Sequence, residues 1–416
     1  MKSKLKQAGI LPWVILAIAL GIAAGFVFPD WLSRIFVTFN DLFSQFLSFS
    51  IPLIIVGLIV PAIADLGRGA GKWLGITAAL AYGSSLFAGF LTFLAAKAIY
   101  PSIISADDGF TVSDENEALT GYISDITIPP VFGVMTALVL AFVIGIGLSL
   151  APRGVIRKGF VEFREIITSL ISKVIVPLLP LHIFGIFLNL TSTGNIGPII
   201  AAVAKIVVFV LVLEVIILGT QYGVAGAIAK KNPFKAFATM LPAYFTALGT
   251  SSSAATIPVS LRQTLKNGVS RTVASFVVPL CATIHLAGSM SKIIAFAMAI
   301  IVMNGLSVST SALVGFVFML GIIMIAAPGV PGGAIMASVG LLASMLGFDD
   351  ASLGLMIATY IALDSFGTAT NVTGDGAIAM VIDKMAKGDA IEATENVEGF
   401  HDKAEFDAET YMKSVS

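Results

Sequence analysis

The sequence is poor in the residues on which most soluble chemistry depends. Its 416 residues include one cysteine and three histidines, and only 12% are charged, against roughly 25% in soluble domains. The lone Cys281 excludes an intrachain disulfide and any site built from several cysteines. A formal net charge of −1 argues against a nucleic-acid partner. No spacing specifies a catalytic triad, a Ser–Lys pair or a metal-ligand motif, so we do not expect an enzyme.

Apolar residues, by contrast, make up 57% of the chain. They are grouped in runs long enough to cross a bilayer, which predicts an all-α, polytopic protein of the cell membrane. We expect the first run to be retained, because it is too long for a signal-peptide core and more spans follow it. The runs are Leu11–Val27, Phe46–Ile63, Trp73–Ile99, Val131–Leu150, Ile171–Leu190 and Ile196–Ile228.

The charged residues between these runs predict the topology. Six helices counted from a cytoplasmic N-terminus place every basic cluster up to Lys235 on the cytoplasmic side. The same count places the acidic loop Asp107–Glu117 outside, and both termini are expected in the cytoplasm. The basic clusters are Lys2–Lys6, Arg68–Lys72, Arg153–Lys158, Lys230–Lys235, Arg262–Arg271 and Lys384–Lys387.

The pattern of simple spans fails after Lys235. The Ser-rich stretch Gly249–Pro258 interrupts one apolar segment and has basic clusters on both sides, which favours a re-entrant hairpin entered from the cytoplasm. The stretch Ala326–Gly333 interrupts another segment and predicts a second hairpin entered from outside. Each stretch alone is also compatible with close helix packing or a plain loop. Together they indicate inverted repeats with broken helices, a pattern typical of secondary transporters.

A polar stripe lies in the last apolar segment. Asp364, Thr368, Asn371 and Asp375 are spaced so that they share one face of a helix. Each carboxylate costs about 2.5–3.5 kcal/mol at the centre of a membrane helix, so such residues normally face a cavity, an ion or a substrate. The stripe and the two hairpin tips together predict a binding site at membrane depth.

Three ordered motifs carry a resemblance to a known family. Ser251–Pro258, Gly329–Gly333 and Asn371–Asp375 resemble signatures of the dicarboxylate/amino acid:cation symporters, the relatives of glutamate transporters and neutral amino acid exchangers. The resemblance implies eight transmembrane helices with two opposed re-entrant hairpins, assembled as a homotrimer. It also implies an elevator mechanism, in which a transport domain moves against a fixed scaffold and the outer hairpin acts as the gate.

The resemblance also divides the chain. Scaffold helices 1 and 2 are expected in residues 1–72, helix 3 of the transport domain in 73–100, and the acidic loop with helices 4–6 in 101–229. Of these, helices 4 and 5 belong to the scaffold and helix 6 to the transport domain. The transport core is expected in 230–386, with the inner hairpin at 235–262, helix 7 at 270–303, the outer hairpin at 310–347 and helix 8 at 352–386. Residues 387–416 are expected to be a polar cytoplasmic tail.

By resemblance, Asp364 binds the substrate ammonium, Asp375 ligates sodium, and the hairpin tips hold the substrate α-carboxylate. No cofactor is implied beyond sodium as the coupling ion. The implied substrate site comprises Ser251, Ser252, Ser253, Val330, Pro331, Gly332, Asp364, Gly367, Thr368 and Asn371. The implied sodium sites draw on Ser84, Ser85, Cys281, Thr283, His285, Asn371 and Asp375.

Two departures from the family pattern affect the expected function. Members with acidic substrates carry an arginine where this chain has Gly367, so we expect a neutral amino acid and extra room for its side chain. Ala287 replaces an aspartate of one sodium site, so we expect fewer sodium ions per cycle than in glutamate transporters. His285 replaces an asparagine and either acts as a neutral hydrogen-bonding group or carries a proton.

Two alternatives remain open. In the first, the fold is the same but the substrate is an acidic amino acid or a dicarboxylate, with proton coupling through His285. The second is an anion channel, since polar hairpins can also line a water path.

Overall fold

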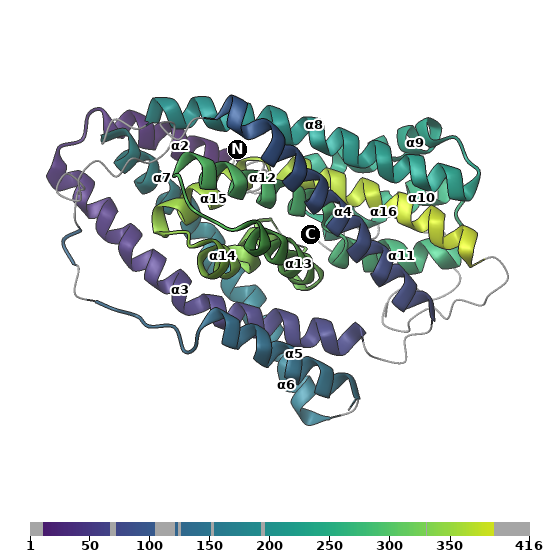
Figure 1. Cartoon of the computed structure of the whole chain (residues 1–416). Coiled ribbons are helices and arrows are strands. Elements are labelled where there is room, and N and C mark those ends of the chain that lie inside the picture. The colour runs from purple at the N-terminus through teal and green to yellow at the C-terminus, as the bar shows by residue number, and fades with distance from the viewer. Residues whose placement is uncertain are drawn as a thin grey trace, which may run out of the picture.

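The computed structural model describes residues 11–66, 72–104, 121–123, 126–150, 154–192, 196–329 and 331–386. In these residues every regular element is a helix (Figure 1). The predicted acidic loop at 107–117, the basic cluster at 2–6, the tail at 387–416 and Val330 lie outside the described residues. The helices are α2 (Leu11–Gly25), α3 (Asp30–Leu66), α4 (Lys72–Ile103), α5 (Val134–Leu150), α6 (Val155–Leu170), η2 (Ile171–Ile175), α7 (Val176–Ser192), α8 (Ile196–Ala229), α9 (Pro233–Thr250), α10 (Ser253–Lys266), α11 (Arg271–Ile284), α12 (Ala287–Met303), α13 (Thr310–Ala326), α14 (Gly333–Leu346), α15 (Asp350–Ala362) and α16 (Asp364–Met385).

The long helices are those of a polytopic membrane protein. In the part of the chain that the structure describes, five stretches are long and apolar enough to cross a bilayer, and α15 with α16 makes a sixth if that bent pair is one span. Helices α2, α5, α13 and α14 are apolar but shorter. Eight full spans therefore remain a prediction. The five stretches are Asp30–Ala64, Lys72–Ile103, Val155–Ser192, Ile199–Ala229 and Arg271–Met303.

Both predicted interruptions occur where the sequence places them. Helix α9 ends at Thr250 and is followed by Ser251, whose φ of 50° lies in the left-handed region. The Ser252 side chain caps α10 by accepting from the Ala255 N–H. Helix α13 ends at Ala326, and α14 begins after Gly332, whose φ is +73°. In each pair the two helices pack against one another, which makes α9–α10 a first hairpin and α13–α14 a second hairpin.

Two further breaks were not predicted. The family resemblance predicts continuous helices at 270–303 and 352–386, but the first is interrupted at His285 and Leu286 and the second bends by 59° at Leu363. The physical reason for the first break is visible in its partners. The side-chain oxygen of Asn371 accepts the N–H of Gly288 at 2.8 Å and of Ser289 at 3.4 Å, which satisfies amides freed by the break.

Helices α12 and α16 form the centre of the molecule and are buried along nearly their whole length. Helix α16 packs against α8, α9, α11 and α12, while α12 also packs against α4. At the other side of the molecule α2 packs against α7, and α3 against α5 (Figure 1). Apolar side chains such as Val139, Val143 and Val215 point outward and are more than half exposed, as expected for a surface in contact with lipid.

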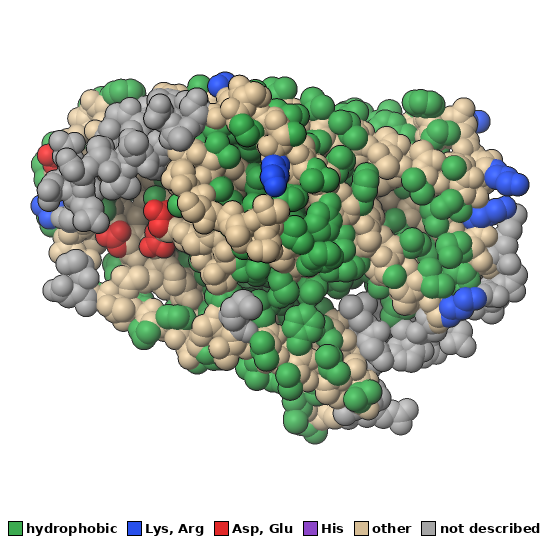
Figure 2. All heavy atoms as spheres, viewed as in Figure 1, with side chains coloured by type: hydrophobic (Ala, Val, Ile, Leu, Met, Phe, Trp, Pro, Cys, Tyr) green, Lys and Arg blue, Asp and Glu red, His purple; other side chains and the backbone are tan. Residues whose placement is uncertain are grey.

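Charge is distributed unevenly along the long axis of the molecule. On the face shown in Figure 2, Lys and Arg side chains gather at the end where α9, α10 and α11 meet, and Asp and Glu side chains lie toward the opposite end. Between them lies a band rich in apolar side chains. The pattern agrees with a membrane-embedded chain whose basic loops share one side.

Candidate substrate and cation site

The tips of both hairpins meet at a small cavity against α16. The cavity has a volume of about 20 Å³, little more than an ordered water needs. The first hairpin contributes Ser251 and Ser253, and the Ser252 hydroxyl donates to the Gly329 carbonyl of the second hairpin at 3.1 Å. The two tips are thus in direct contact beside the cavity. Its other walls include Leu286, Ser289, Pro328, Gly329, Ala334, Tyr360, Asp364, Thr368 and Asn371.

Asp364 is the acidic side chain of this cavity, and both of its oxygens are engaged. Oδ2 accepts the Gly332 N–H of the second hairpin at 2.8 Å, and Oδ1 lies 3.4 Å from Lys292 Nζ. Because Asp364 is the first residue of α16, its carboxylate also lies where the helix dipole favours negative charge. The Thr368 hydroxyl donates to the Asp364 carbonyl at 2.8 Å, which ties the second residue of the stripe to the first.

Lys292 is the residue of this site that sequence reasoning missed. Its ammonium is fully buried, donates to the Leu363 carbonyl at 3.0 Å, and lies 4.1 Å from the centre of the Tyr360 ring. A Cβ added to Gly367 would lie 2.3 Å from Lys292 Cε and 2.6 Å from Nζ. The expected extra room beside Gly367 is therefore wrong, because the lysine fills it. A signal existed, since a lone lysine in an apolar span is itself a candidate functional residue.

Asn371 joins the cavity to the break between α11 and α12. Besides accepting from the two backbone amides, it donates from Nδ2 to Ser289 Oγ at 3.1 Å, and the Tyr360 hydroxyl donates to the same oxygen at 2.9 Å. A network of hydrogen bonds thus fixes Asn371 while leaving it at the cavity wall. Its predicted role between the substrate and the ion site stays a prediction.

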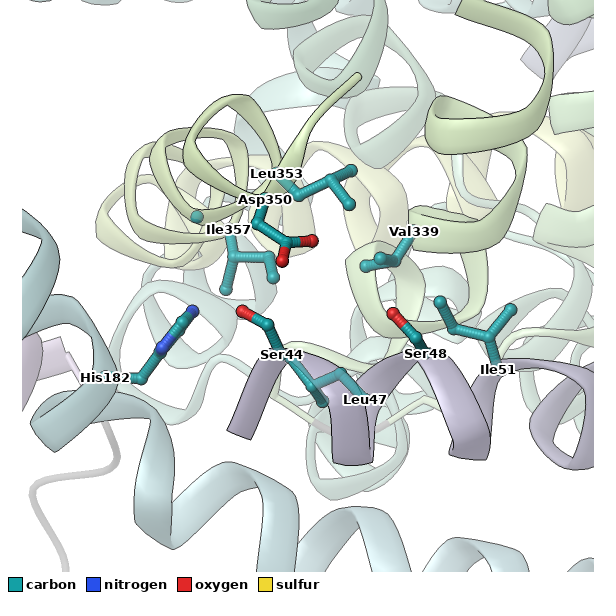
Figure 3. Close-up of a pocket in the computed structure, with 10 residues that line it drawn as sticks. Ser44, Leu47, Ser48, Ile51, His182, Val339, Asp350, Leu353 and Ile357 are labelled. Atoms are coloured by element: carbon teal, nitrogen blue, oxygen red, sulfur yellow. The ribbon is translucent and has the colours of Figure 1, made fainter. Parts of the chain in front are cut away.

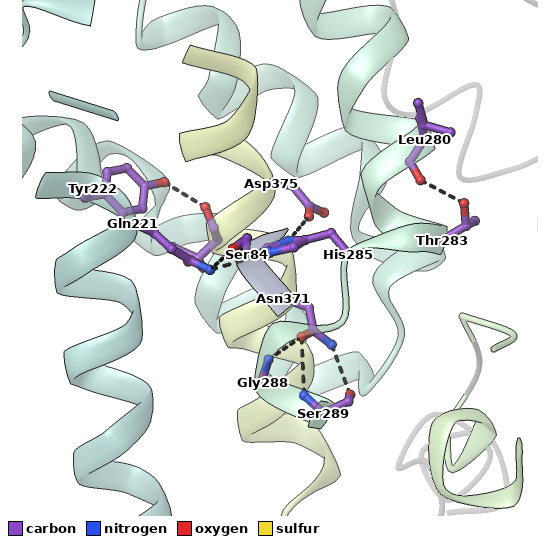
Figure 4. A network of polar contacts seen from close by, with 11 residues as sticks. Ser84, Gln221, Tyr222, Leu280, Thr283, His285, Gly288, Ser289, Asn371 and Asp375 are labelled. Carbon is purple, nitrogen blue, oxygen red and sulfur yellow. Dashed lines mark hydrogen bonds and ion pairs between the residues drawn. The ribbon is translucent and has the colours of Figure 1, made fainter. Parts of the chain in front are cut away.

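The far end of the stripe is a second polar network (Figure 4). His285 Nδ1 lies 2.9 Å from Asp375 Oδ1, and its Nε2 lies 3.0 Å from Ser84 Oγ. Gln221 donates from Nε2 to the same Ser84 oxygen at 2.9 Å. The Tyr222 hydroxyl donates to the Thr373 carbonyl at 2.8 Å. His285, Asp375 and Ser84, all predicted from the sequence, are thus in contact, whereas Gln221 was not predicted.

Three buried oxygens near this network have no hydrogen-bond partner among the described residues. They are Ser85 Oγ, Thr373 Oγ1 and Gln221 Oε1. The Gln221 oxygen lies against Gly374, directly between Thr373 and Asp375 in the chain. Unpaired neutral oxygens beside a carboxylate are suitable donors for a hard cation.

Other predicted residues lie apart from these contacts. The Thr283 hydroxyl donates to the Leu280 carbonyl (Figure 4), whereas the predicted sodium ligand is the Thr283 backbone carbonyl, which stays a prediction. Cys281 is buried as a free thiol, and its carbonyl accepts the His285 N–H. Pro331 is partly buried at the tip of the second hairpin.

A second cavity, of about 10 Å³, lies where α3 and α7 face α14 and α15 (Figure 3). Ser44, Ser48 and His182 face Asp350 across it. Close to this cavity a Cβ on Gly354 would lie 2.1 Å from the Ile186 side chain, so α15 and α7 approach closely there. The cavity is too small to hold more than about one water molecule.

Apolar helices broken at buried polar groups are typical of membrane transporters. A profile of the sodium:dicarboxylate symporter family matches residues 10–385, and the chain belongs to this family. It is 27% identical over 256 residues to excitatory amino acid transporter 2 of Mus musculus, covering 60% of this chain but 45% of that protein. It is 30% identical over 261 residues to excitatory amino acid transporter 1 of Rattus norvegicus, covering 61% and 47%. The chain thus spans less than half the length of these relatives. It is 25% identical over 387 residues to the serine/threonine transporter SstT of Acinetobacter baumannii (strain AYE), covering 89% of this chain and 95% of that protein.

Proposed function

We propose that this chain is a secondary active symporter that carries a small neutral amino acid together with sodium. One observation carries the proposal: Asp364 and two helix N-termini meet at a single small cavity. Helix α10 begins at Ser253 and α14 at Gly333, so both present positive dipole ends toward an anion. The Asp364 carboxylate can pair with a ligand ammonium, and the helix N-termini can donate to a ligand carboxylate. An amino acid carries both of these groups.

Two observations support a neutral side chain. The charge of Lys292 is already engaged by Asp364, and the ammonium does not line the cavity. A relative whose match covers 89% of this chain is named for serine and threonine. Lys292 also supports the second candidate, an acidic amino acid, because it is a positive charge close to the cavity. The names of the other relatives agree with that alternative.

For the coupling ion, the Asp375 carboxylate and the unpaired Gln221 oxygen that lies against Gly374 support sodium. The close contact between His285 and Asp375 supports the alternative that a proton takes part. The mechanism that we propose is the elevator of the family, in a homotrimer, with the second hairpin as gate. Opening the gate would break the Gly332–Asp364 and Ser252–Gly329 hydrogen bonds, which lie beside the cavity in this structure.

Thermal unfolding of the purified protein tests substrate and ion together. We expect L-serine, L-alanine or L-threonine to raise the unfolding temperature in sodium but not in choline, because only the loaded native state gains about 2.7 kcal/mol at 100 times Kd. Stabilisation by L-aspartate alone would contradict the neutral substrate. Equal stabilisation without sodium would contradict sodium coupling.

Uptake into proteoliposomes then separates sodium from protons. We expect an inward sodium gradient to drive uptake at equal pH on both sides. His285→Asn is the matched variant, since it restores the asparagine of the family pattern. If uptake follows a proton gradient without sodium and is lost in His285→Asn, the proton alternative is correct.

A further inference from the structure

A buried lysine occupies the carboxylate that a substrate ammonium would need. Lys292 Nζ lies 3.4 Å from Asp364 Oδ1 and is enclosed by the Leu363 carbonyl and the Tyr360 ring. Asp364 lines the cavity, whereas Lys292 approaches it from behind, out of α12. An incoming ammonium therefore meets a carboxylate that is already paired. It has to displace a like charge in order to bind.

The displaced lysine has a second carboxylate within electrostatic reach. Glu214 of α8 is 2% exposed, and neither of its oxygens has a hydrogen-bond partner among the described residues. Its charge interacts with that of Lys292, and α8 packs against α12, the helix that carries Lys292. The Thr370 hydroxyl is the neutral polar group beside Glu214. Burying an unpaired carboxylate costs free energy, so a cation that pairs with Glu214 would stabilise the protein.

We propose that the Lys292 ammonium alternates between two carboxylates: Asp364 when the site is empty and Glu214 when a substrate ammonium occupies Asp364. The inference rests on the proposed function, because it takes an amino acid as the ligand of Asp364. A lysine suits this role, since its ammonium is a compact charge on a flexible four-carbon stem. Gly367 suits it too, because a side chain there would block the stem.

The exchange has a consequence for the transport cycle. A carrier that returns empty must move the Asp364 carboxylate through the membrane, and an unpaired charge there is costly. Lys292 supplies the missing cation from the chain itself. The empty return then requires no external cation at Asp364, and Glu214 keeps the lysine paired on the loaded stroke.

A double-mutant cycle on Lys292 and Glu214 tests the exchange. Labelled L-serine is bound to the purified full-length protein in sodium, and Kd is measured for the wild type, Lys292→Met, Glu214→Gln and the double variant. We expect Lys292→Met to tighten binding about tenfold, because the competitor for Asp364 is gone. We expect Glu214→Gln to weaken binding about tenfold in the wild-type background and to have no effect beside Lys292→Met. Lys205→Met is the matched control, a lysine of α8 bonded to the Ile103 carbonyl, and should leave Kd unchanged.

Other outcomes overturn the proposal. Weaker serine binding in Lys292→Met, or an equal effect of Glu214→Gln in both backgrounds, would show that Lys292 does not alternate. If Lys292→Met does not fold, Lys292→Gln replaces it in the same cycle. If the folded wild-type protein binds no amino acid in sodium, the proposed function itself fails and this inference fails with it, an outcome distinct from the two above.

Discussion

At the scale of single residues, the site depends on a glycine in one helix that leaves space for a long side chain from the neighbouring helix. Gly367 of α16 has no side chain, and the end of the Lys292 side chain, from α12, occupies the space beside it. The two helices approach so closely that a Cβ on Gly288 would also lie 2.6 Å from the Gly367 carbonyl. Positive charge at this site therefore comes from a helix other than the one that carries the polar stripe.

Replacing Gly367 with Ala tests this packing. We expect the free energy of unfolding to fall by about 1–3 kcal/mol, because the new Cβ overlaps the Lys292 stem in a closely packed interior. The control is Gly219→Ala in α8, where a Cβ meets nothing within 4 Å. Alanine is the better helix former there by about 1 kcal/mol, so the control should be neutral or stabilising. Thermal unfolding in one detergent compares the two, and equal effects would contradict the overlap.

The charge of Asp364 is tested by Asp364→Asn. Asparagine keeps the shape but loses the charge, and a hydrogen bond to a charged group contributes about 1.5–3 kcal/mol, so we expect a 10- to 100-fold loss of amino acid affinity. Asp350→Asn, at the separate cavity next to His182, should leave affinity unchanged. The measurement is binding of labelled L-serine to protein that unfolds cooperatively. Undiminished binding in Asp364→Asn would show that the substrate ammonium does not bind Asp364.

At the scale of elements, the sequence predicted the hairpins better than the continuous helices. Gly, Pro and Ser clusters interrupt the apolar runs at both hairpin tips, and such local signals can be read without tertiary structure. The breaks at His285 and Leu363 have no comparable marker, since the first is stabilised by Asn371 from a distant part of the chain. For the same reason the contact of Lys292 with Asp364 was missed: its register against α16 is a tertiary property of a helix that is buried on all sides.

The contact between the hairpin tips predicts a crosslink. The chain has one cysteine, so Cys281→Ala gives a background without thiols, to which Ser252→Cys and Gly329→Cys are added. Ser252 Oγ lies 3.1 Å from the Gly329 carbonyl, so we expect oxidation to join the tips and abolish uptake. A reductant should restore uptake. Each single cysteine variant serves as the control and should keep its uptake under oxidant.

At the scale of the whole molecule, α11 and α12 together indicate the direction in which the chain crosses the membrane. The stretch Arg271–Met303 has 33 residues, about 50 Å of helix at 1.5 Å per residue, which exceeds the apolar thickness of roughly 30 Å. The loops at its two ends should therefore lie on opposite sides of the membrane. The basic clusters of the sequence predict a cytoplasmic position for the α10–α11 loop.

Thiol labelling checks this orientation. In the Cys281→Ala background we expect Ser309→Cys, before α13, to react with a membrane-impermeant maleimide on intact cells. Lys266→Cys, at the end of α10, should react only after the membrane is opened. Both positions are exposed, so failure to react would reflect sidedness rather than burial. Labelling of both from one side would contradict the topology.

The fit of Lys292 against Gly367 also constrains how such a chain can diverge. The same space would have to hold both a side chain at position 367 and a long side chain at position 292. The residues at these two positions therefore cannot vary independently. A lineage that acquired the lysine first would have passed through a steric conflict, whereas loss of the side chain at 367 opens the path. Among related chains, a bulky residue at one position should therefore accompany a smaller or redirected residue at the other.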